Sequence, residues 1–519
     1  MENKKYIVMY IVLMLVYPMT SVVLPKYYGK IVSEFQNGEK INVTTPAILI
    51  IIVFVMFTML NRLDKEFVPR LQAYIRLNVV KEIFENYKDK FEEQELGVLI
   101  SKIVKLPILV RDLMYHIRNY VVPLVVDLPF VLAEFTIIDP GLGLIVACGI
   151  IASILVLIPK FLKCLQISLE TDHESDSVHE QISELFENML NIYSMNTQSE
   201  EIGKLEKCQD DVIKSYKSTI DCTNSLKMCA NSMSLIITGC VLVYIYQLYR
   251  CNKIDMGDIT SIGITGMYMF TSLGKLSGEI PAMIFDLGAY IHIQKYLDSL
   301  SPSNHIYKNF NIKDGQITFR NVNISYGDKQ VLKNFNITLK PKESIAIIGQ
   351  IGSGKSSLAK ALLKLIPYEG NILVDDNDIS EINPDELRSQ ILYVCQNPLP
   401  FNRTLYENIV YGNNDITKEK VRDIFRKYEL DQFFNHDLDT KVGKKGGYLS
   451  GGQRQMIFLL RVLLTQKPII ILDEPTSSLD DKSSKYIMKM LDDILRNRTV
   501  LLITHDSDIG NLATKKLEL

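Results

Sequence analysis

The sequence predicts an all-α transmembrane domain of six helices followed by an α/β domain. Two observations support this division. Long apolar runs recur through about the first 285 residues, whereas the remainder spreads its charges over alternating strand-like and helix-like segments. A chain of 519 residues is also too long for one ordinary hydrophobic core. We predict the transmembrane domain over residues 1–290, a linker over 291–314 and the α/β domain over 315–519.

Six segments approach the length of a membrane-spanning helix, which needs about 20 mainly apolar residues. The first has a basic start like that of a signal peptide, but it lacks a small-residue cleavage site, so we expect it to be retained. Charged, helix-forming stretches follow the second and fourth segments and are too polar to lie in lipid. The six predicted spans are Tyr6–Leu24, Ala47–Leu60, Tyr120–Ile138, Leu142–Ile158, Ser234–Tyr249 and Ile259–Met283.

Four charged residues fall inside these spans. Asp127 and Glu134 belong to the third, and Lys275 and Glu279 belong to the sixth. An ionisable group in hydrocarbon costs several kcal/mol unless it is paired or hydrated, so we expect these side chains to face a water-filled or protein-lined interior. They would line a translocation path. A local i, i+4 pair between Lys275 and Glu279, or a span boundary displaced by one turn, explains them equally well.

Composition excludes other classes of function. The formal net charge of −3 comes without a basic stripe, so nucleic acid is not expected as a partner. The eight cysteines include no CxxC pair and no cluster with histidine at metal-ligand spacing, so we predict reduced thiols that serve as small apolar residues. The tripeptide "NVT" at Asn42 matches a glycosylation sequon and is expected to be a chance match.

A phosphate-binding loop (P-loop) begins the chemistry of the α/β domain. The stretch "ESIAIIGQIGSGKSSLAKALLKLI" places GxxxxGK[ST] between an apolar strand and an amphipathic helix. Backbone N–H groups of such a loop converge on phosphates, with Lys355 at the β- and γ-oxygens and Ser356 on Mg²⁺. The predicted ATP-binding residues here are Gly349, Gln350, Ile351, Gly352, Ser353, Gly354, Lys355, Ser356 and Ser357.

Two carboxylates follow a second buried strand in "PIIILDEPTSSLD". Ligands gather at the carboxyl ends of parallel strands, so Asp473 is placed to hold Mg²⁺ through water. Glu474 is placed to orient or deprotonate the attacking water. The strand in "VLLITHD" would bring His505 to the same edge. The predicted cofactors are therefore ATP and Mg²⁺, and the predicted side for this domain is the cytosol.

A second glycine-containing motif, "LSGGQRQ" from Leu449 to Gln455, stands between the P-loop and the paired carboxylates. With this motif the C-terminal half resembles a P-loop ATPase of the ATP-binding cassette (ABC) family, whose signature sequence it matches. The resemblance implies that two cassettes pack head to tail and that each signature contacts the ATP bound to the partner. The residues it assigns to that contact are Ser450, Gly451, Gly452 and Gln453.

The same resemblance implies further roles by position. Tyr326 resembles the aromatic residue that stacks on adenine, and Gln396 resembles the glutamine that senses the γ-phosphate and metal. Ser477–Asp480 resembles the loop that communicates across the dimer, and His505 the γ-phosphate switch. The predicted catalytic set is Glu474, His505, Gln396 and Lys355, and the predicted magnesium set is Ser356, Gln396 and Asp473.

Six spans before one cassette resemble a half-transporter of the ABC exporter type. The stretches "ELGVLISKI" and "ENMLNIYSMNTQSEEI" resemble the two intracellular regions that carry coupling helices. The implied partners are the lipid bilayer, an unknown transported substrate, and a second half-transporter in a homodimer or heterodimer. Two departures are Lys444, where exporters of this type usually carry Glu, and an ending at "LATKKLEL" without the usual final helix.

We therefore predict a multi-pass membrane ATPase that couples ATP hydrolysis to alternating-access export. Three alternatives are a soluble ABC ATPase of repair or translation, which the apolar N-terminal half disfavours, a regulatory membrane protein that binds ATP, and an importer built on the exporter fold. The sequence shows no peptidase-like N-terminal extension, which disfavours a processing peptide exporter. Lipid, drug, peptide and metabolite substrates all stay open.

Overall fold

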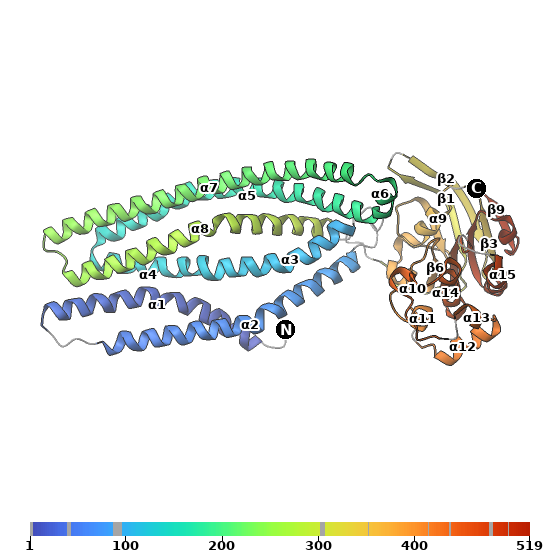
Figure 1. Cartoon of the computed structure of the whole chain (residues 1–519), viewed down its shortest axis with the longest axis horizontal. Helices are drawn as coiled ribbons and strands as arrows, with labels where there is room; N and C mark the ends of the chain where they lie inside the picture. The colour runs from blue at the N-terminus through green and yellow to red at the C-terminus, as the bar shows by residue number, and fades with distance from the viewer. Residues whose placement is uncertain are drawn as a thin grey trace. The chain divides into compact units, whose positions relative to one another are not determined.

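The structure is a computed structural model, and its described residues separate into two compact units. The N-terminal unit lies within residues 1–85 and 94–301 and is built from long helices, whereas the C-terminal unit, which groups residues 86–93 with 302–519, combines sheets and shorter helices (Figure 1). The described residues are 4–38, 43–86, 96–300, 307–327, 329–350, 352–413, 415–434, 437–476, 481–496 and 498–519.

In its described part the N-terminal unit is entirely helical, as the predicted fold class requires. The third long segment bends through a five-residue π-helical turn, η2, just before Pro123, whose missing N–H cannot support regular α-helical bonding. The elements are α1 Lys4–Gln36, α2 Thr44–Asn86, α3 Leu96–His116, η2 Ile117–Val121, α4 Val122–Ile138, α5 Pro140–Glu187, α6 Met189–Met195, α7 Gln198–Arg250 and α8 Met256–Leu300.

Five of the predicted spans fall inside one of these long helices, and the third, Tyr120–Ile138, begins in η2 and continues through α4. Over the described residues, four helical segments are long and apolar enough to cross a membrane, judged by length and composition. They are Thr44–Glu85, Gly97–Ile138, Pro140–Glu187 and Gln198–Arg250. Large apolar side chains such as Phe54 and Leu144 are more than 60% exposed on their outer faces, as expected of a surface in contact with lipid. Helix α8 continues to Leu300, through the first part of the predicted linker.

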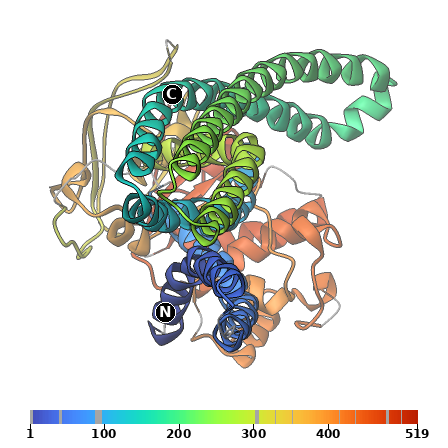
Figure 2. The same ribbon diagram turned by 90° about the vertical axis from the view of Figure 1, so that its left-hand side faces the viewer.

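Helices α5 and α7 lie side by side in both views (Figures 1 and 2). Between them the structure forms a disulfide from Cys164 to Cys222, so the prediction that all cysteines are reduced is wrong for this pair. The disulfide could not be predicted from the sequence, because the two cysteines are 58 residues apart and only the antiparallel packing of α5 and α7 brings the thiols together. The other six cysteines are free thiols.

Polar side chains tie the N-terminal helices together outside their apolar contacts. On the segments predicted to extend beyond the membrane, Asp176 of α5 accepts hydrogen bonds from Lys102 Nζ of α3 at 2.5 Å and His292 Nε2 of α8 at 2.8 Å. A second cluster joins α1, α2 and η2, in which Arg118 Nη1 and the Tyr10 hydroxyl both donate to Asp64. These clusters fix the relative positions of helices that are far apart in the sequence.

The charged residues predicted inside the spans differ in their surroundings. Asp127 is buried, and Glu134 Oε1 accepts a hydrogen bond from Ser261 Oγ at 2.7 Å. Glu279 Oε2 lies 3.8 Å from His116 Nδ1, whereas Lys275 is exposed. A translocation path along these residues therefore stays a prediction.

The C-terminal unit contains two sheets. An antiparallel sheet has the order β2-β1-β4-β5, and a parallel sheet has the order β6-β7-β8-β3-β9. The strands are β1 Ile317–Tyr326, β2 Lys329–Leu339, β3 Ser344–Ile348, β4 Glu369–Val374, β5 Asn377–Asp378, β6 Ile391–Val394, β7 Ile469–Asp473, β8 Thr499–Thr504 and β9 Lys515–Glu518.

Continuous apolar sequences form the parallel strands because both of their faces are covered. Successive side chains alternate between two cores: Ile470 and Leu472 of β7 face one cluster, while Ile469 and Ile471 face the other. The first cluster contains the inner faces of α14 and α15, and the second contains α9 and the antiparallel sheet. The helices are α9 Lys355–Leu362, α10 Pro384–Gln390, α11 Leu405–Ile409, α12 Lys418–Lys427, α13 Asp431–Phe434, α14 Gly451–Leu464, α15 Asp481–Leu495 and α16 Ser507–Gly510.

Candidate nucleotide site

The P-loop joins the end of β3 to the start of α9, as the sequence predicts. Gly352 and Gly354 have φ values of +88° and +87°, in the left-handed region that glycine enters without steric cost. A Cβ on Gly354 would lie 2.9 Å from the carbonyl oxygen of Val331. The loop therefore needs glycine here both for its conformation and for its close approach to β2.

Lys355 is the first residue of α9, and its side chain folds back into the loop. Its Nζ donates to the carbonyl oxygens of Gly349 at 2.8 Å and Gln350 at 2.7 Å, and the residue is only 6% exposed. The Lys355 ammonium can donate three hydrogen bonds, and it is held, buried, inside the P-loop. This placement suits an anion bound within the loop.

Ser356 and Asp473 meet between α9 and β7. Ser356 Oγ donates to Asp473 Oδ1 at 3.0 Å, and the Tyr393 hydroxyl of β6 donates to Asp473 Oδ2 at 3.0 Å. Burial raises the pKa of the Asp473 carboxyl above its usual value, although both hydrogen bonds act in the opposite direction. A hydroxyl and a carboxylate are hard oxygen ligands of the type that Mg²⁺ prefers, so this pair fits the predicted magnesium ligands.

Glu474 follows directly and turns away from the strand. Its φ of +50° is unusual for a residue with a side chain, and its N–H donates to the carbonyl oxygen of Ile503 on β8 at 2.9 Å. This conformation places Glu474 Oε2 2.6 Å from His505 Nδ1. Glu474 is buried and His505 is more than half exposed, so the pair lies at the rim of the sheet.

Gln396 and Tyr326 come from the ends of two other strands. Gln396 follows β6 and is exposed, and it lines a small cavity together with Glu474 and Gln455. Tyr326 ends β1, where its hydroxyl lies 3.2 Å from Ser357 Oγ and its ring is partly exposed. The stacking of Tyr326 on adenine stays a prediction.

Sheet order explains why residues from distant motifs converge. Strands β6, β7, β8 and β3 are consecutive neighbours, and all are parallel. Their carboxyl ends therefore share one edge, which carries Lys355, Gln396, Asp473, Glu474 and His505. Ile351 and the segment Ser477–Asp480 lie outside the described residues.

The signature sequence begins a different helix, α14. Ser450 is its N-cap: its Oγ accepts from Gln453 N at 3.2 Å, and Gln453 Oε1 accepts from Ser450 N at 2.8 Å, which forms a capping box. The Gln453 amide also donates to the Phe433 carbonyl oxygen. Gln453 thus orders the start of α14, and its predicted contact with a partner's ATP stays a prediction. Gly452 is buried and Gly451 half-buried.

Two features of the site were missed from sequence. The capping box has a recognisable pattern, because Ser450 and Gln453 stand at the S-x-x-Q spacing. Tyr393 had no sequence signal, since its bond to Asp473 depends on β6 and β7 being neighbours. Lys444 lies in the short turn Lys444–Gly446 before the signature, and its side chain is exposed.

Comparison with known proteins agrees with this geometry. Residues 332–477 match the family model described as ABC transporter. The chain is 29% identical over 504 residues to ABC transporter B family member 4 of Dictyostelium discoideum, covering 93% of this chain and 64% of that protein. It is 27% identical to a putative export ATP-binding/permease protein of Rickettsia typhi, covering 90% and 83%.

A solved structure described as a bacterial Atm1-family ABC exporter with ATP bound has the same fold. It matches with a TM-score of 0.86 and 19% sequence identity, and it covers 100% of this chain and 94% of its own. The predicted fold class is confirmed, and the helical unit with its lipid-exposed faces makes this a multi-pass membrane protein with a cytosolic cassette. The chain therefore carries one ATP-binding cassette that matches the ABC transporter family after a helical membrane domain, an arrangement that fits a half-transporter of the exporter type.

Proposed function

We propose that this chain forms a dimeric exporter in which ATP hydrolysis at two shared cassette sites drives substrate across the bilayer. One observation carries the proposal: Glu474 and its partner His505, 2.6 Å apart, share a sheet edge with the Ser356–Asp473 pair and the P-loop. A chain that only bound nucleotide would not need a buried carboxylate held beside this edge. The N-terminal helices supply the membrane path.

The chemistry follows from the positions of the side chains. Backbone N–H groups of the P-loop and the Lys355 ammonium hold the phosphates of ATP. Ser356, Asp473 and Gln396 would hold Mg²⁺, which neutralises charge on the β- and γ-oxygens. Glu474 orients the attacking water and accepts its proton. His505 fixes the Glu474 carboxylate through Nδ1, and its exposed ring reaches the γ-phosphate.

Two copies complete each site. The N-terminus of α14 presents backbone N–H groups at Gly451 and Gly452, and helix N-termini favour anions. Ser450 holds that terminus in place through its capping box. We assign this surface to the γ-phosphate of ATP in the second copy, so that hydrolysis requires both chains and its cycle opens and closes the membrane domain.

ATP hydrolysis by the full chain in lipid vesicles tests the proposal. Glu474→Gln keeps the shape of the side chain and removes the base, so we expect the rate to fall by about 10²- to 10⁴-fold while ATP still binds. Glu369→Gln, which changes an exposed carboxylate of β4, is the matched control and keeps the wild-type rate. Equal rates for wild type and Glu474→Gln would contradict an ATPase and favour a regulatory ATP-binding protein. ATP-dependent uptake into inside-out vesicles, with lipid, drug, peptide and metabolite probes, then separates export from import.

A further inference from the structure

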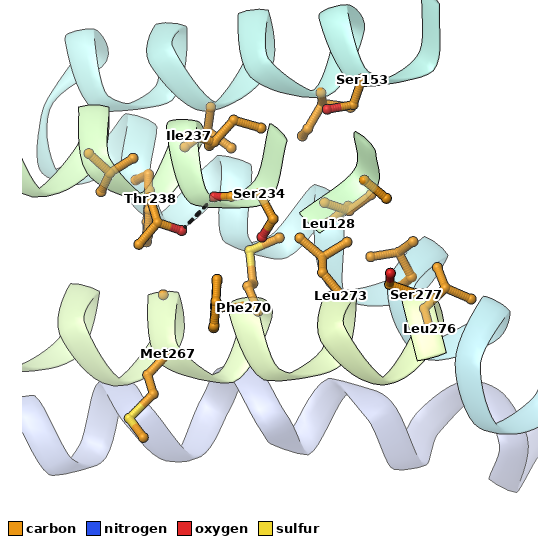
Figure 3. Close-up of a pocket in the computed structure, with 18 of the residues that line it drawn as sticks. Leu128, Ser153, Ser234, Ile237, Thr238, Met267, Phe270, Leu273, Leu276 and Ser277 are labelled. Carbon is orange, nitrogen blue, oxygen red and sulfur yellow. Dashed lines mark hydrogen bonds between the residues drawn. The ribbon is translucent and has the colours of Figure 1, made fainter. Parts of the chain in front are cut away.

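A cavity of about 640 Å³ lies among α4, α5, α7 and α8 of the membrane domain (Figure 3). Its volume falls within the range of sites that bind drug-sized ligands, about 300–1,000 Å³. Nearly all of its lining residues belong to the predicted spans, so the cavity lies at membrane depth. Next to the cavity, buried apolar side chains such as Val131 of α4 and Leu142 of α5 belong to one hydrophobic cluster.

The lining is almost entirely apolar. Leu128, Ile237, Phe270 and Leu273 are typical, and none of the described lining residues carries an ionisable group. The four charged residues of the predicted spans do not line it. Because a charged ligand would lose its hydration here without gaining a counter-ion, the cavity selects against ionised molecules.

Four hydroxyl side chains interrupt the apolar lining, and three of them already donate hydrogen bonds. Ser153 Oγ donates to Gly149 O at 2.8 Å, Thr238 Oγ1 to Ser234 O at 2.9 Å and Ser277 Oγ to Lys227 O at 3.4 Å. Ser234 differs.

Ser234 is 8% exposed, and its Oγ is buried without a hydrogen-bond partner among the described residues. Serine in a helix usually donates to its own backbone four residues earlier, as Ser153 does. A buried hydroxyl without a partner costs about 1–3 kcal/mol. The free hydroxyl therefore offers one hydrogen bond to a molecule in the cavity, where Figure 3 shows Ser234 among the lining side chains.

Two glycines on α8 leave room on the same lining. A Cβ built on Gly263 or Gly266 would meet nothing within 4 Å. Packing between helices is the usual reason for glycine in a membrane helix, but no other described residue of this chain packs against either glycine. Met267 and Met269 beside them are flexible, so the lining adapts to ligands of different outline.

We propose that this cavity determines which class of substrate the transporter accepts. It binds a neutral, mainly apolar amphiphile whose single polar group forms a hydrogen bond with Ser234. The inference rests on the proposed function, which it deepens by excluding ionised substrates. Hydrocarbon of the ligand packs on α4, α5, α7 and α8, and its hydroxyl or carbonyl group pairs with Ser234 Oγ. A monoacylglycerol has this chemistry and serves as the probe.

The absence of tryptophan from the chain makes a direct binding test possible. Phe270→Trp places the one fluorophore in the cavity, and Val243→Trp places it on the outer face of α7, where Val243 is 61% exposed. Each full-length variant is reconstituted without nucleotide in phosphatidylcholine nanodiscs containing a monoacylglycerol with a brominated chain, which quenches indole fluorescence. We expect the brominated monoacylglycerol to quench the tryptophan at position 270 half-maximally at a mole fraction about tenfold lower than the mole fraction needed for the tryptophan at position 243.

Matched variants locate the site and its hydrogen bond. Gly266→Leu fills the cavity and abolishes the selective quenching, whereas Gly274→Leu, at an open position of α8 outside the lining, preserves it. Ser234→Ala weakens binding of monooleoylglycerol about threefold to tenfold, and Ser153→Ala, whose hydroxyl is already bonded, leaves it unchanged. Both alanine variants bind a hydrocarbon probe without a polar head equally well.

Several outcomes would overturn the inference. Equal quenching at 270 and 243 means that bulk lipid fills the space, and competition by oleate as strong as by monooleoylglycerol means that charge is not excluded. Quenching absent at 270, with emission that changes when the dimer dissociates, means that the second copy fills the cavity. Failure of monooleoylglycerol to stimulate an otherwise active ATPase overturns the substrate role alone. A chain that hydrolyses no ATP contradicts the proposed function, while the nucleotide-free quenching still reports on the cavity.

Discussion

The Asp473 carboxylate accepts hydrogen bonds from two different elements, so it responds to changes in both. Burial raises the pKa of its carboxyl, and the hydrogen bonds from Ser356 and Tyr393 lower it again. Mg²⁺ binds the ionised carboxylate. Loss of either hydrogen-bond donor would raise the pKa of Asp473, so a proton would compete with Mg²⁺ for the carboxylate up to a higher pH. Tyr393 does not belong to the predicted metal ligands, so its effect is separable from theirs.

Removing the Tyr393 hydroxyl tests this balance. Tyr393→Phe raises the pKa of Asp473 further, so the acid limb of the ATPase pH profile moves to higher pH. We expect the Mg²⁺ requirement at neutral pH to rise about threefold to tenfold. Tyr368→Phe is the control, since the Tyr368 hydroxyl is buried without a hydrogen-bond partner among the described residues. An unchanged pH profile for Tyr393→Phe would show that this hydroxyl does not act on Asp473.

Helices α3, α5 and α8 are joined by the cluster of Lys102, Asp176 and His292. Burial raises the pKa of Asp176, but hydrogen bonds and charges from His292 and Lys102 outweigh it and hold the pKa below its usual value. A depressed carboxyl pKa contributes stability above the unfolded value near pH 4 and loses it as the pH falls through the folded value. The cluster therefore weakens only in acid, below about pH 4.

Asp176→Asn removes the negative charge at all pH values. Lys102, whose side chain is 4% exposed, would then lack its counter-ion, and we expect a loss of about 3 kcal/mol in unfolding free energy. Thermal unfolding of the purified protein at neutral pH measures it. Asp211→Asn, which breaks an exposed pair with Lys214 on α7, leaves the melting temperature unchanged. Equal melting temperatures for the two variants would contradict a structural role for Asp176.

The sequence allows the helices, strands and P-loop to be predicted because each depends on local composition or spacing. The apolar run of Ile469–Leu472 needs only its own residues to indicate a buried strand, and Gly354 needs only its motif. Pairs formed by packing are different: Cys164 with Cys222 and Tyr393 with Asp473 depend on which helix or strand lies alongside. The cavity could not be predicted from the sequence either, because residues that line an apolar cavity and residues that fill an apolar core show the same pattern of hydrophobic side chains.

The complete transporter is expected to contain two copies of the catalytic edge, each finished by the other chain. Ser450 stands at the beginning of α14, away from the P-loop in sequence, and its capping box orders the residues that we propose to face the partner. A change at Ser450 in one chain should therefore impair the opposite ATP site.

Differently tagged copies test this coupling. In a mixed dimer, one chain carries Ser450→Arg and its own active Glu474, and the other carries Glu474→Gln. We expect this mixed dimer to keep at least about twice the activity of the reciprocal dimer that carries both changes in one chain. In the mixed dimer both defects fall in the same composite site and the other site stays intact, whereas in the reciprocal dimer each site contains one defect. Lys444→Ala, an exposed change outside the capping box, is the control. Identical activities of the two arrangements would contradict a composite site.

The disulfide between α5 and α7 has a consequence for the integrity of the chain. It closes a covalent ring around the segment that contains α6, from Cys164 to Cys222. A protease that cuts once within this ring leaves both fragments attached to each other until a reductant is added. A molecule nicked at the α6 turn would thus remain a single species under oxidising conditions, with both of its long helical arms retained.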